Sequence, residues 1–274
     1  MSGTGHFSSL VAQSMSNINL LAVSVGNTRT RVGAFVDDTL TDVSTFRNDR
    51  EEKIGEAINT AFSSLQGKDD STILMSSVQP AVADKIEMII KKQLGRDVYR
   101  VERDLPIPIG RQLDPEAMVG EDRLLTAAAA YDKLKQACVI IDAGTALTVD
   151  LVDGIGTFHG GAILPGAQLQ LDSLSSRTAQ LPEVELSKPA DCLGHSTAEA
   201  MLSGVYHGMR GAVRELVEQF AFKTGQYPMV IATGGDAQVL FRECDYVDRV
   251  VPDLTLMGLA LTLRAQLEQA DEPA

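Results

Sequence analysis

Short apolar runs alternate with longer amphipathic stretches along most of the chain. Runs of alternating or β-branched residues, which predict strands, cover residues 20–25, 30–36, 40–46, 72–77, 98–101, 137–142, 146–152, 157–163 and 229–232. Apolar residues recur at helical spacing over residues 51–65, 80–94, 115–135, 168–178, 197–222, 236–243 and 254–268. Because strands and helices interleave, the pattern predicts an α/β protein whose strand triplets can form antiparallel meanders.

Residues 104–115 contain three prolines and a glycine, which predicts a loop and a hinge between two halves. Asp114 followed by Pro115 is typical of a helix start, and a break of that helix at Gly120 is left open. The first 19 residues are rich in Ser and Gly and lack a basic segment and a cleavage site, so we expect a loose tail. The expected organisation is a flexible tail over 1–19, an N-terminal domain over 20–117 and a C-terminal domain over 118–274.

One segment has an echo further along the chain. Residues 21–28 read Leu-Ala-Val-Ser-Val-Gly-Asn-Thr, and residues 139–146 read Val-Ile-Ile-Asp-Ala-Gly-Thr-Ala. Each is an apolar strand, then a glycine turn with amide or hydroxyl side chains, then a second β-type run. The echo predicts a duplicated domain with both turns facing one cleft. The alternative is two unrelated hairpins that share a glycine, because glycine is common in such turns.

These turns suit the binding of anions. A glycine turn exposes backbone N–H groups, and neighbouring hydroxyls add further donors. Asp142, at the end of its strand, can bind a cation that bridges phosphates, whereas the matching Ser24 is neutral. A third turn, Thr233-Gly234-Gly235, allows close approach of a flat nucleoside, although alone it reads as a tight turn. The Walker motif and the dinucleotide glycine motif are both missing from the sequence.

Composition and charge limit the class of partner. The 274 residues are 44% hydrophobic and 22% charged, which is typical of a globular protein. The net charge of −13 argues against a broad surface for nucleic acid or anionic membranes. No apolar run approaches about 18 residues, so no transmembrane helix is expected. Three widely spaced cysteines offer no disulfide framework and no paired metal ligands, and they favour a reducing cytosol.

The chain resembles the type III pantothenate kinases, which belong to the superfamily of acetate and sugar kinases, heat-shock ATPases and actin. The resemblance covers about residues 20–263 and rests on the order and spacing of several short segments. They are Val25-Gly26-Asn27-Thr28, Ser76-Ser77-Val78 with Pro80, Gly120-Glu121-Asp122-Arg123, Asp142-Ala143-Gly144-Thr145-Ala146, Gly160-Gly161-Ala162-Ile163 with Pro165-Gly166, Thr178-Ala179-Gln180-Leu181-Pro182, Thr233-Gly234-Gly235, and Leu254-Thr255-Leu256 with Gly258-Leu259. The resemblance implies duplicated ribonuclease-H-like (actin-like ATPase) halves, each a mixed five-stranded sheet with flanking helices, with a cleft between them.

The resemblance also implies an activity. ATP and pantothenate would give ADP and 4′-phosphopantothenate, the first step of coenzyme A biosynthesis. It implies a homodimer that uses Mg²⁺ and a monovalent cation, K⁺ or NH₄⁺. With the composition, we expect a cytoplasmic protein that binds neither nucleic acid nor membrane.

By position, several segments of the resemblance acquire expected roles. The first phosphate-binding turn would comprise Ser24, Val25, Gly26, Asn27, Thr28, Arg29, Thr30 and Arg31. Thr145, Gly234 and Gly235 would also contact ATP, and Asp142 would hold the monovalent cation. Pantothenate would contact Gly120, Glu121, Asp122, Arg123 and Thr197, with Asp122 as proton acceptor and the site near the dimer interface. Arg123 can pair bidentately with the substrate carboxylate.

The chain departs from the family pattern at four positions. Ser24 stands where the family usually has Asp, Glu121 where it often has Ala, Leu113 where a Tyr is common, and Ser196 where Asn is usual. The loss of a carboxylate at Ser24 bears directly on Mg²⁺. Two alternatives therefore stay open: a regulatory or nucleotide-binding homologue with weak or no kinase activity, and a superfamily kinase that acts on another small hydroxylated acid.

Overall fold

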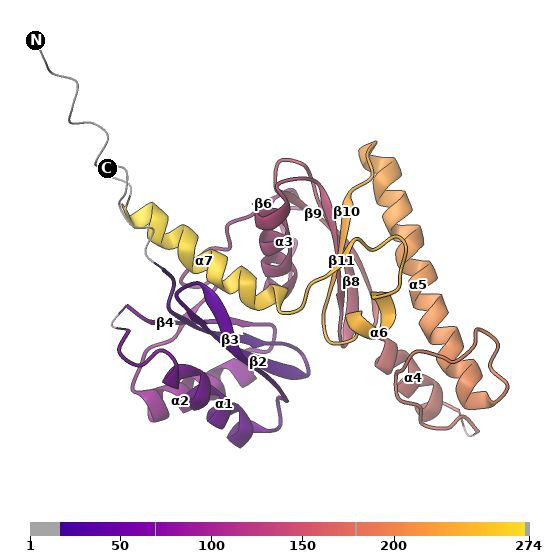
Figure 1. The fold of residues 1–274 in the computed structure, drawn as a ribbon, viewed down its shortest axis with the longest axis horizontal. Helices are drawn as coiled ribbons and strands as arrows, with labels where there is room; N and C mark the ends of the chain where they lie inside the picture. Colours follow the sequence, from indigo (N-terminus) through magenta and orange to yellow (C-terminus); the bar gives the residue numbers. More distant parts are fainter. Residues whose placement is uncertain (1–16, 69, 179, 272–274) are drawn as a thin grey trace, which may run out of the picture.

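The computed structural model describes residues 17–68, 70–178 and 180–271. Two β-sheets lie side by side, each with helices on its outer face, and two further helices fill the space between them (Figure 1). Most of the tail expected over residues 1–19 falls outside the described residues. Of its last three residues, Ile18 is buried in the central core.

The first sheet has five strands in the order β3-β2-β1-β4-β5. Its elements are β1 (Leu20–Val25), β2 (Arg29–Val36), β3 (Thr39–Arg47), α1 (Glu51–Ser63), β4 (Thr72–Ser77), α2 (Pro80–Leu94) and β5 (Tyr99–Arg100). Strands β1, β2 and β3 form an antiparallel meander, as expected, and β4 and β5 run parallel to β1. Helix α2 begins with proline in its first turn and ends at Gly95, whose left-handed φ of 67° suits a glycine cap.

The second sheet has six strands in the order β11-β10-β7-β8-β9-β6. Its elements are β6 (Gly110–Arg111), α3 (Glu121–Leu134), β7 (Cys138–Ala143), β8 (Ala146–Val152), β9 (Thr157–Pro165), α4 (Ala167–Ser176), α5 (Thr197–Thr224), β10 (Met229–Thr233), α6 (Ala237–Phe241), β11 (Arg249–Val250) and α7 (Leu254–Asp271). Strands β7, β8, β9, β10 and β11 repeat the order and directions of β1 to β5. The predicted duplication is therefore confirmed by topology.

The structure corrects two expectations from the sequence. The second sheet has six strands and not five, because β6 of the linker pairs with β9. The helix expected from Pro115 begins at Glu121, since Ala117 N–H closes a single turn on Asp114 O at 2.9 Å and Gly120 then takes an extended N-cap conformation. Most of the residues between are exposed and only Val119 packs against the central core, so a helix there would have little apolar surface to bury and the turn does not continue.

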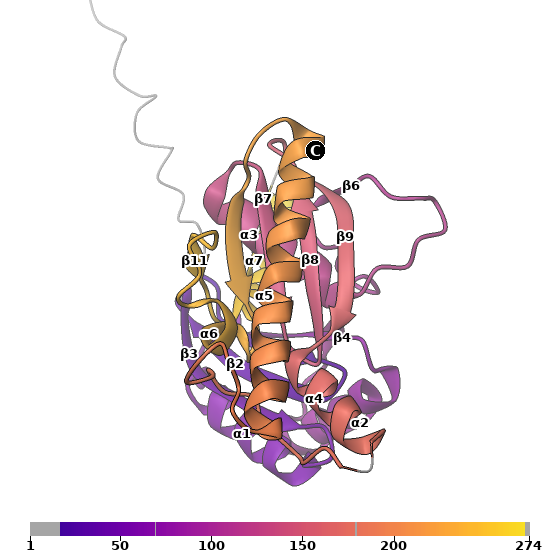
Figure 2. The ribbon, with the colours of Figure 1, turned by 90° about the vertical axis from the view of Figure 1, so that its right-hand side faces the viewer.

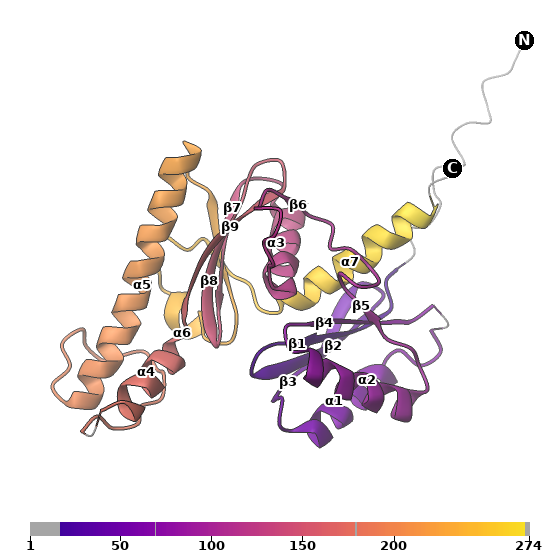
Figure 3. The same ribbon diagram turned by 180° about the vertical axis from the view of Figure 1, so that it is seen from behind.

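Helices α3 and α7 join the two halves. The central core contains apolar residues of both helices and of β1 and β7. Separate cores lie under α1 and α2 and under α5, the helices on the outer faces of the two sheets (Figures 2 and 3). Gly258 allows the close crossing of the helices, because a Cβ there would lie 2.8 Å from the Cβ of Leu125. The C-terminal helix therefore packs against the first sheet as well as against α3.

Candidate active site

The turn between β1 and β2 is tightly braced. Gly26 N–H donates to Arg29 O at 2.9 Å, and Asn48 Nδ2 donates to Gly26 O at 3.0 Å. Val23 and Val25 pack under α1 and α2, so the alternating Ser24 side chain faces the opposite side, toward α3 and α7. The first turn thus presents its hydroxyl to the junction of the two halves.

The second turn touches the first directly. Thr145 follows Gly144 in the β7–β8 turn, and its Oγ1 donates to Thr28 Oγ1 at 3.0 Å. This hydrogen bond joins two turns that lie far apart in the sequence and occupy equivalent places in the two sheets.

The third turn lies against the second. Gly234 has a φ of 95°, and a Cβ there would clash with Ala143 O and the Asp142 carboxylate. Only glycine therefore fits this approach without strain. A Cβ at Gly235 would lie 4.0 Å from Arg29 Nη1, so the first turn also approaches the third.

Asp142 is half-buried among charged groups. Burial raises the pKa of its carboxyl group to about 7, the negative charges of Asp122 and Asp150 act in the same direction, and Arg31 opposes them. Arg31 itself forms an ion pair with Asp253, with Nη1 3.1 Å from Oδ1. A carboxylate that ionises at such a cost is suited to a bound cation.

The start of α3 brings a second acidic group to the junction. Glu121 Oε2 accepts the Ser77 N–H at 2.7 Å, at a level of β4 where β5 has already ended. Asp122 Oδ1 accepts the Arg123 N–H at 2.8 Å. Burial raises the pKa of Asp122, and it raises the pKa of Glu121 to about 6.

The Arg123 guanidinium pairs with Asp150, a residue that lies outside the candidate motifs of the sequence. Its Nε lies 3.1 Å from both carboxylate oxygens of Asp150, and its Nη2 also donates to Asp150 Oδ1. The Asp150 side chain is fully buried, at 0% exposed. Its one sequence signal was a charged residue in an otherwise apolar stretch of β8, between Val149 and Leu151.

The structure does not bring Thr197 into this group. Thr197 is exposed at the start of α5, where Glu199 N–H donates to Ser196 Oγ at 3.2 Å in a capping box. Helix α5 covers the face of the second sheet opposite α3 (Figure 1). Within one copy, Thr197 is therefore separated from Asp122 by the sheet.

Oxygen atoms at the junction suit hard cations. The described part of the chain has no cluster of three or more His, Cys, Asp or Glu side chains arranged to hold a metal. However, Ser76, the register partner of Ser24 on β4, has a buried Oγ without a hydrogen-bond partner among the described residues. Serine hydroxyls with the Asp142 carboxylate fit a cation whose other ligands are phosphate and water.

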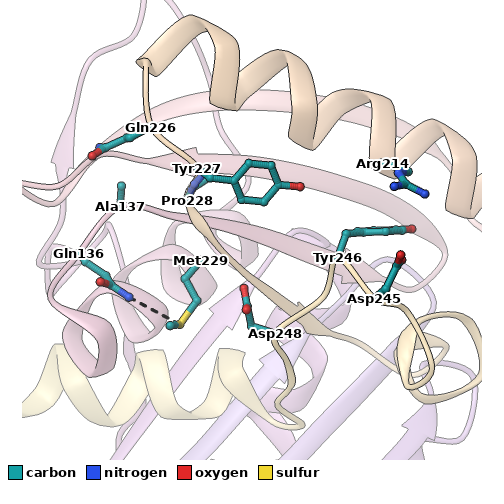
Figure 4. A pocket seen from close by; sticks show the side chains of 10 residues that line it. All are labelled: Gln136, Ala137, Arg214, Gln226, Tyr227, Pro228, Met229, Asp245, Tyr246 and Asp248. Carbon is teal, nitrogen blue, oxygen red and sulfur yellow. Dashed lines mark hydrogen bonds between the residues drawn. The ribbon is translucent and has the colours of Figure 1, made fainter.

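A separate hollow of about 570 Å³ lies at the other end of the second sheet, beside β10 (Figure 4). Two of its charged groups already have partners: Arg214 is bonded to Glu218 at 3.1 Å and lies over the Tyr246 ring, and Asp248 accepts the Val230 N–H at 2.7 Å. The Asp248 hydrogen bond holds the loop before β11 against β10, and the Tyr246 contact holds it against α5.

Comparison with known proteins agrees with the fold. ADP-bound MreB5 of Spiroplasma citri is 11% identical, with a TM-score of 0.51 that covers 93% of this chain and 99% of that one. Component A of the (R)-2-hydroxyglutaryl-CoA dehydratase of Acidaminococcus fermentans is 13% identical, with a TM-score of 0.52 over 93% of this chain and all of that one. These likenesses place the chain in the actin-like ATPase fold.

Sequence comparison narrows the class to one family. The family model described as type III pantothenate kinase matches residues 20–219. A type III pantothenate kinase of Frankia alni is 35% identical over 258 residues, which is 90% of this chain and all of the relative. The chain belongs to the type III pantothenate kinase family.

Proposed function

We propose that the protein transfers the γ-phosphoryl group of ATP to the hydroxyl of pantothenate, giving ADP and 4′-phosphopantothenate, the first step of coenzyme A biosynthesis. The observation that carries the proposal is the meeting of the two echoed turns, joined through Thr28 and Thr145 at 3.0 Å, beside the acidic start of α3. The family membership supports the same substrates.

In this proposal the three turns bind ATP. Backbone N–H groups and hydroxyls of the first turn, from Ser24 to Arg31, and of Thr145 hold the phosphates. Gly234 and Gly235 leave room for the nucleoside because they carry no side chain. The chain closes as two domains, 20–117 and 118–274, around the bound nucleotide.

The start of α3 binds the acceptor substrate, pantothenate. Gly120, Glu121, Asp122 and Arg123 line the pantothenate pocket, and Asp122 orients the attacking hydroxyl and accepts its proton. Burial raises the pKa of Asp122, which brings it closer to the working pH of a general base. Since the transition state of phosphoryl transfer is loose, the position of Asp122 matters more than strong basicity.

Two cations complete the proposal. Asp142 would hold a monovalent cation, K⁺ or NH₄⁺, and Ser24 with Ser76 would face a Mg²⁺ carried by the phosphates through water. Bound there, the cations would neutralise charge on the transferred group. The orphaned Ser76 hydroxyl and the raised pKa of Asp142 support these assignments.

We also propose a cytoplasmic homodimer. Leu169 and Leu174 of α4 and Leu193 before α5 are exposed, which supports a second copy on the face that carries Thr197. Thr197 would then meet pantothenate near the interface. Cys138, Cys192 and Cys244 form no disulfide, in keeping with a reducing compartment. Among the described residues no helix is long and apolar enough to cross a membrane.

The test is a coupled ADP-release assay with pantothenate, Mg²⁺ and K⁺. Turnover with pantothenate is the expected result. ATP binding without turnover would support the regulatory alternative, and turnover only with another small hydroxylated acid would select a different kinase.

The Asp122→Asn variant tests the assigned base. We expect turnover to fall by about 10²- to 10⁴-fold, because general-base catalysis typically contributes that much. ATP affinity, measured by calorimetry, should change little. A rate near that of the wild type would refute the assignment.

A further inference from the structure

Asp150 and Arg123 form the most buried ion pair that the described residues contain at the junction of the two halves. The Asp150 side chain is 0% exposed and that of Arg123 is 14% exposed. Both carboxylate oxygens are engaged by the guanidinium. A buried pair of this kind is costly to desolvate and is therefore weak evidence for a purely stabilising role.

The pairing uses only one edge of the guanidinium. Asp150 occupies the edge formed by Nε and Nη2, so the edge formed by Nη1 and Nη2 remains for another planar anion. Nη1 has no hydrogen bond among the described residues and is not one of their buried unpartnered atoms, so it reaches solvent. A carboxylate can bind that second edge bidentately.

The surroundings hold the pair in one orientation. The guanidinium carbon lies 5.6 Å from the centre of the Phe158 ring, which limits its rotation. Opposite, Gly161 of β9 lies so close to Asp150 that a Cβ there would clash with Val149 O and approach Asp150 Oδ1 to 2.7 Å. The backbone thus confines the carboxylate, and the carboxylate confines Arg123.

We propose that Asp150 is a positioning residue that fixes Arg123 with its second edge toward the carboxylate of the acceptor substrate, and so sets the preference for an acid over its neutral analogue. This inference rests on the proposed function and on the role given there to Arg123. Asp150 does not touch the substrate and acts only through the guanidinium.

The test compares pantothenate with pantothenyl alcohol, which keeps the hydroxyl to be phosphorylated and lacks the carboxylate. We expect Asp150→Asn to raise KM for pantothenate about 10- to 100-fold, the loss of one well-made charge-assisted contact. The KM for the alcohol, kcat and the Kd for ATP should each change less than about threefold. A general structural defect would instead change all four.

Two further variants sharpen the test. Asp84→Asn is the control: it removes an exposed carboxylate 2.7 Å from another guanidinium, that of Arg100, which keeps Glu87 as a partner, and it should leave both KM values unchanged. Arg123→Lys keeps a positive charge beside the buried Asp150. A lysine ammonium group cannot bind the Asp150 carboxylate and the substrate carboxylate bidentately, so KM for pantothenate should rise as in Asp150→Asn. If Asp150→Asn does not fold, a near-native KM in this second variant would still overturn the inference.

The outcomes separate the two proposals. If wild-type protein phosphorylates neither compound, the proposed function fails and this inference fails with it. If wild type prefers the acid and Asp150→Asn keeps that preference, the role of Asp150 alone is overturned. A near-native KM for pantothenate in Arg123→Lys would overturn the roles of both Arg123 and Asp150.

Discussion

Ser24 and Asp142 occupy equivalent ends of the duplicated strands β1 and β7, yet one carries a hydroxyl and the other a carboxylate. The two turns therefore suit different ligands, a cation at Asp142 and a phosphate at Ser24. The Asp142 carboxyl group, with a pKa raised to about 7 by burial, gains most from a cation that keeps it ionised. Ser24 places no negative charge in the first turn, so phosphate approaches it without repulsion.

The Ser24→Asp variant tests how much the missing carboxylate costs. We expect the apparent affinity for Mg²⁺, measured as the concentration that gives half-maximal ADP release, to rise about tenfold because a charged ligand replaces a neutral one. Ser24→Asn, which has the same shape without the charge, is the matched control. No change, or a loss, would mean that the turn works without a carboxylate.

At the scale of elements, the start of α3 is tied to the edge of β4. Glu121 supplies the acceptor for Ser77 N–H where β5 no longer runs beside β4. The two acidic residues in the first turn also stabilise the helix, because their negative charges interact favourably with the positive end of the helix dipole. The helix that carries Asp122 therefore has a fixed position relative to the first turn.

This tie predicts a pH-dependent stability. The pKa of Glu121 rises from 4.5 to about 6 in the folded protein, so the folded state binds the proton more tightly than the unfolded state. The contribution of Glu121 to stability is therefore present below pH 4.5 and is lost as pH rises to about 6. We expect Glu121→Gln, which keeps an acceptor oxygen, to gain about 1 kcal/mol over wild type across this window, less than the full pKa shift implies because the carboxyl group is partly screened by solvent.

Urea unfolding of both proteins at pH 4.5 and 7.5 measures the difference. Glu102→Gln provides a control of opposite sign, because hydrogen bonding to Arg111 lowers the pKa of Glu102. A difference between Glu121→Gln and wild type that stays constant with pH would contradict the interpretation.

For the whole molecule, the crossing of α3 and α7 makes the two sheets interdependent. The central core draws apolar residues from both halves, so loss of the crossing should weaken both. The net charge of −13 gives no long-range attraction for two anionic substrates. Binding must therefore rest on local donors at the junction of the halves.

The Gly258→Ala variant tests the crossing. A methyl group would meet Leu125 at 2.8 Å or less, and we expect a loss of about 1–3 kcal/mol in the free energy of unfolding. Gly211→Ala on α5 is the control, because no atom lies within 4 Å of the added methyl group. There helix propensity should raise stability by about 0.5–1 kcal/mol. Equal effects of the two substitutions would show that the crossing tolerates the extra atom.

Local patterns predicted the elements best where they were strong. The bounds of β1, β4 and α2 were predicted to the residue, since short apolar runs mark the two strands and an initial proline marks the helix. Strands β6 and β11 have two residues each and no periodicity to detect. Their pairing depends on where the rest of the sheet lies, which no local pattern specifies.

The site was predictable as a set of turns and not as a set of contacts. The echo around Gly26 and Gly144 identified two equivalent turns from local sequence. The pairing of Arg123 with Asp150 joins α3 to β8, and the separation of Thr197 follows from which face α5 covers. Both depend on packing between elements, which is a property of the folded chain.

Strand β6 has a consequence for association between copies. Its two residues come from the linker and cover part of the outer edge of β9, whose backbone groups would otherwise be free to pair. A shortened linker would pull β6 away and leave that edge as a template for a strand from another chain. By covering this edge of β9, the segment that leads to α3 thus also disfavours aggregation through edge-to-edge strand pairing.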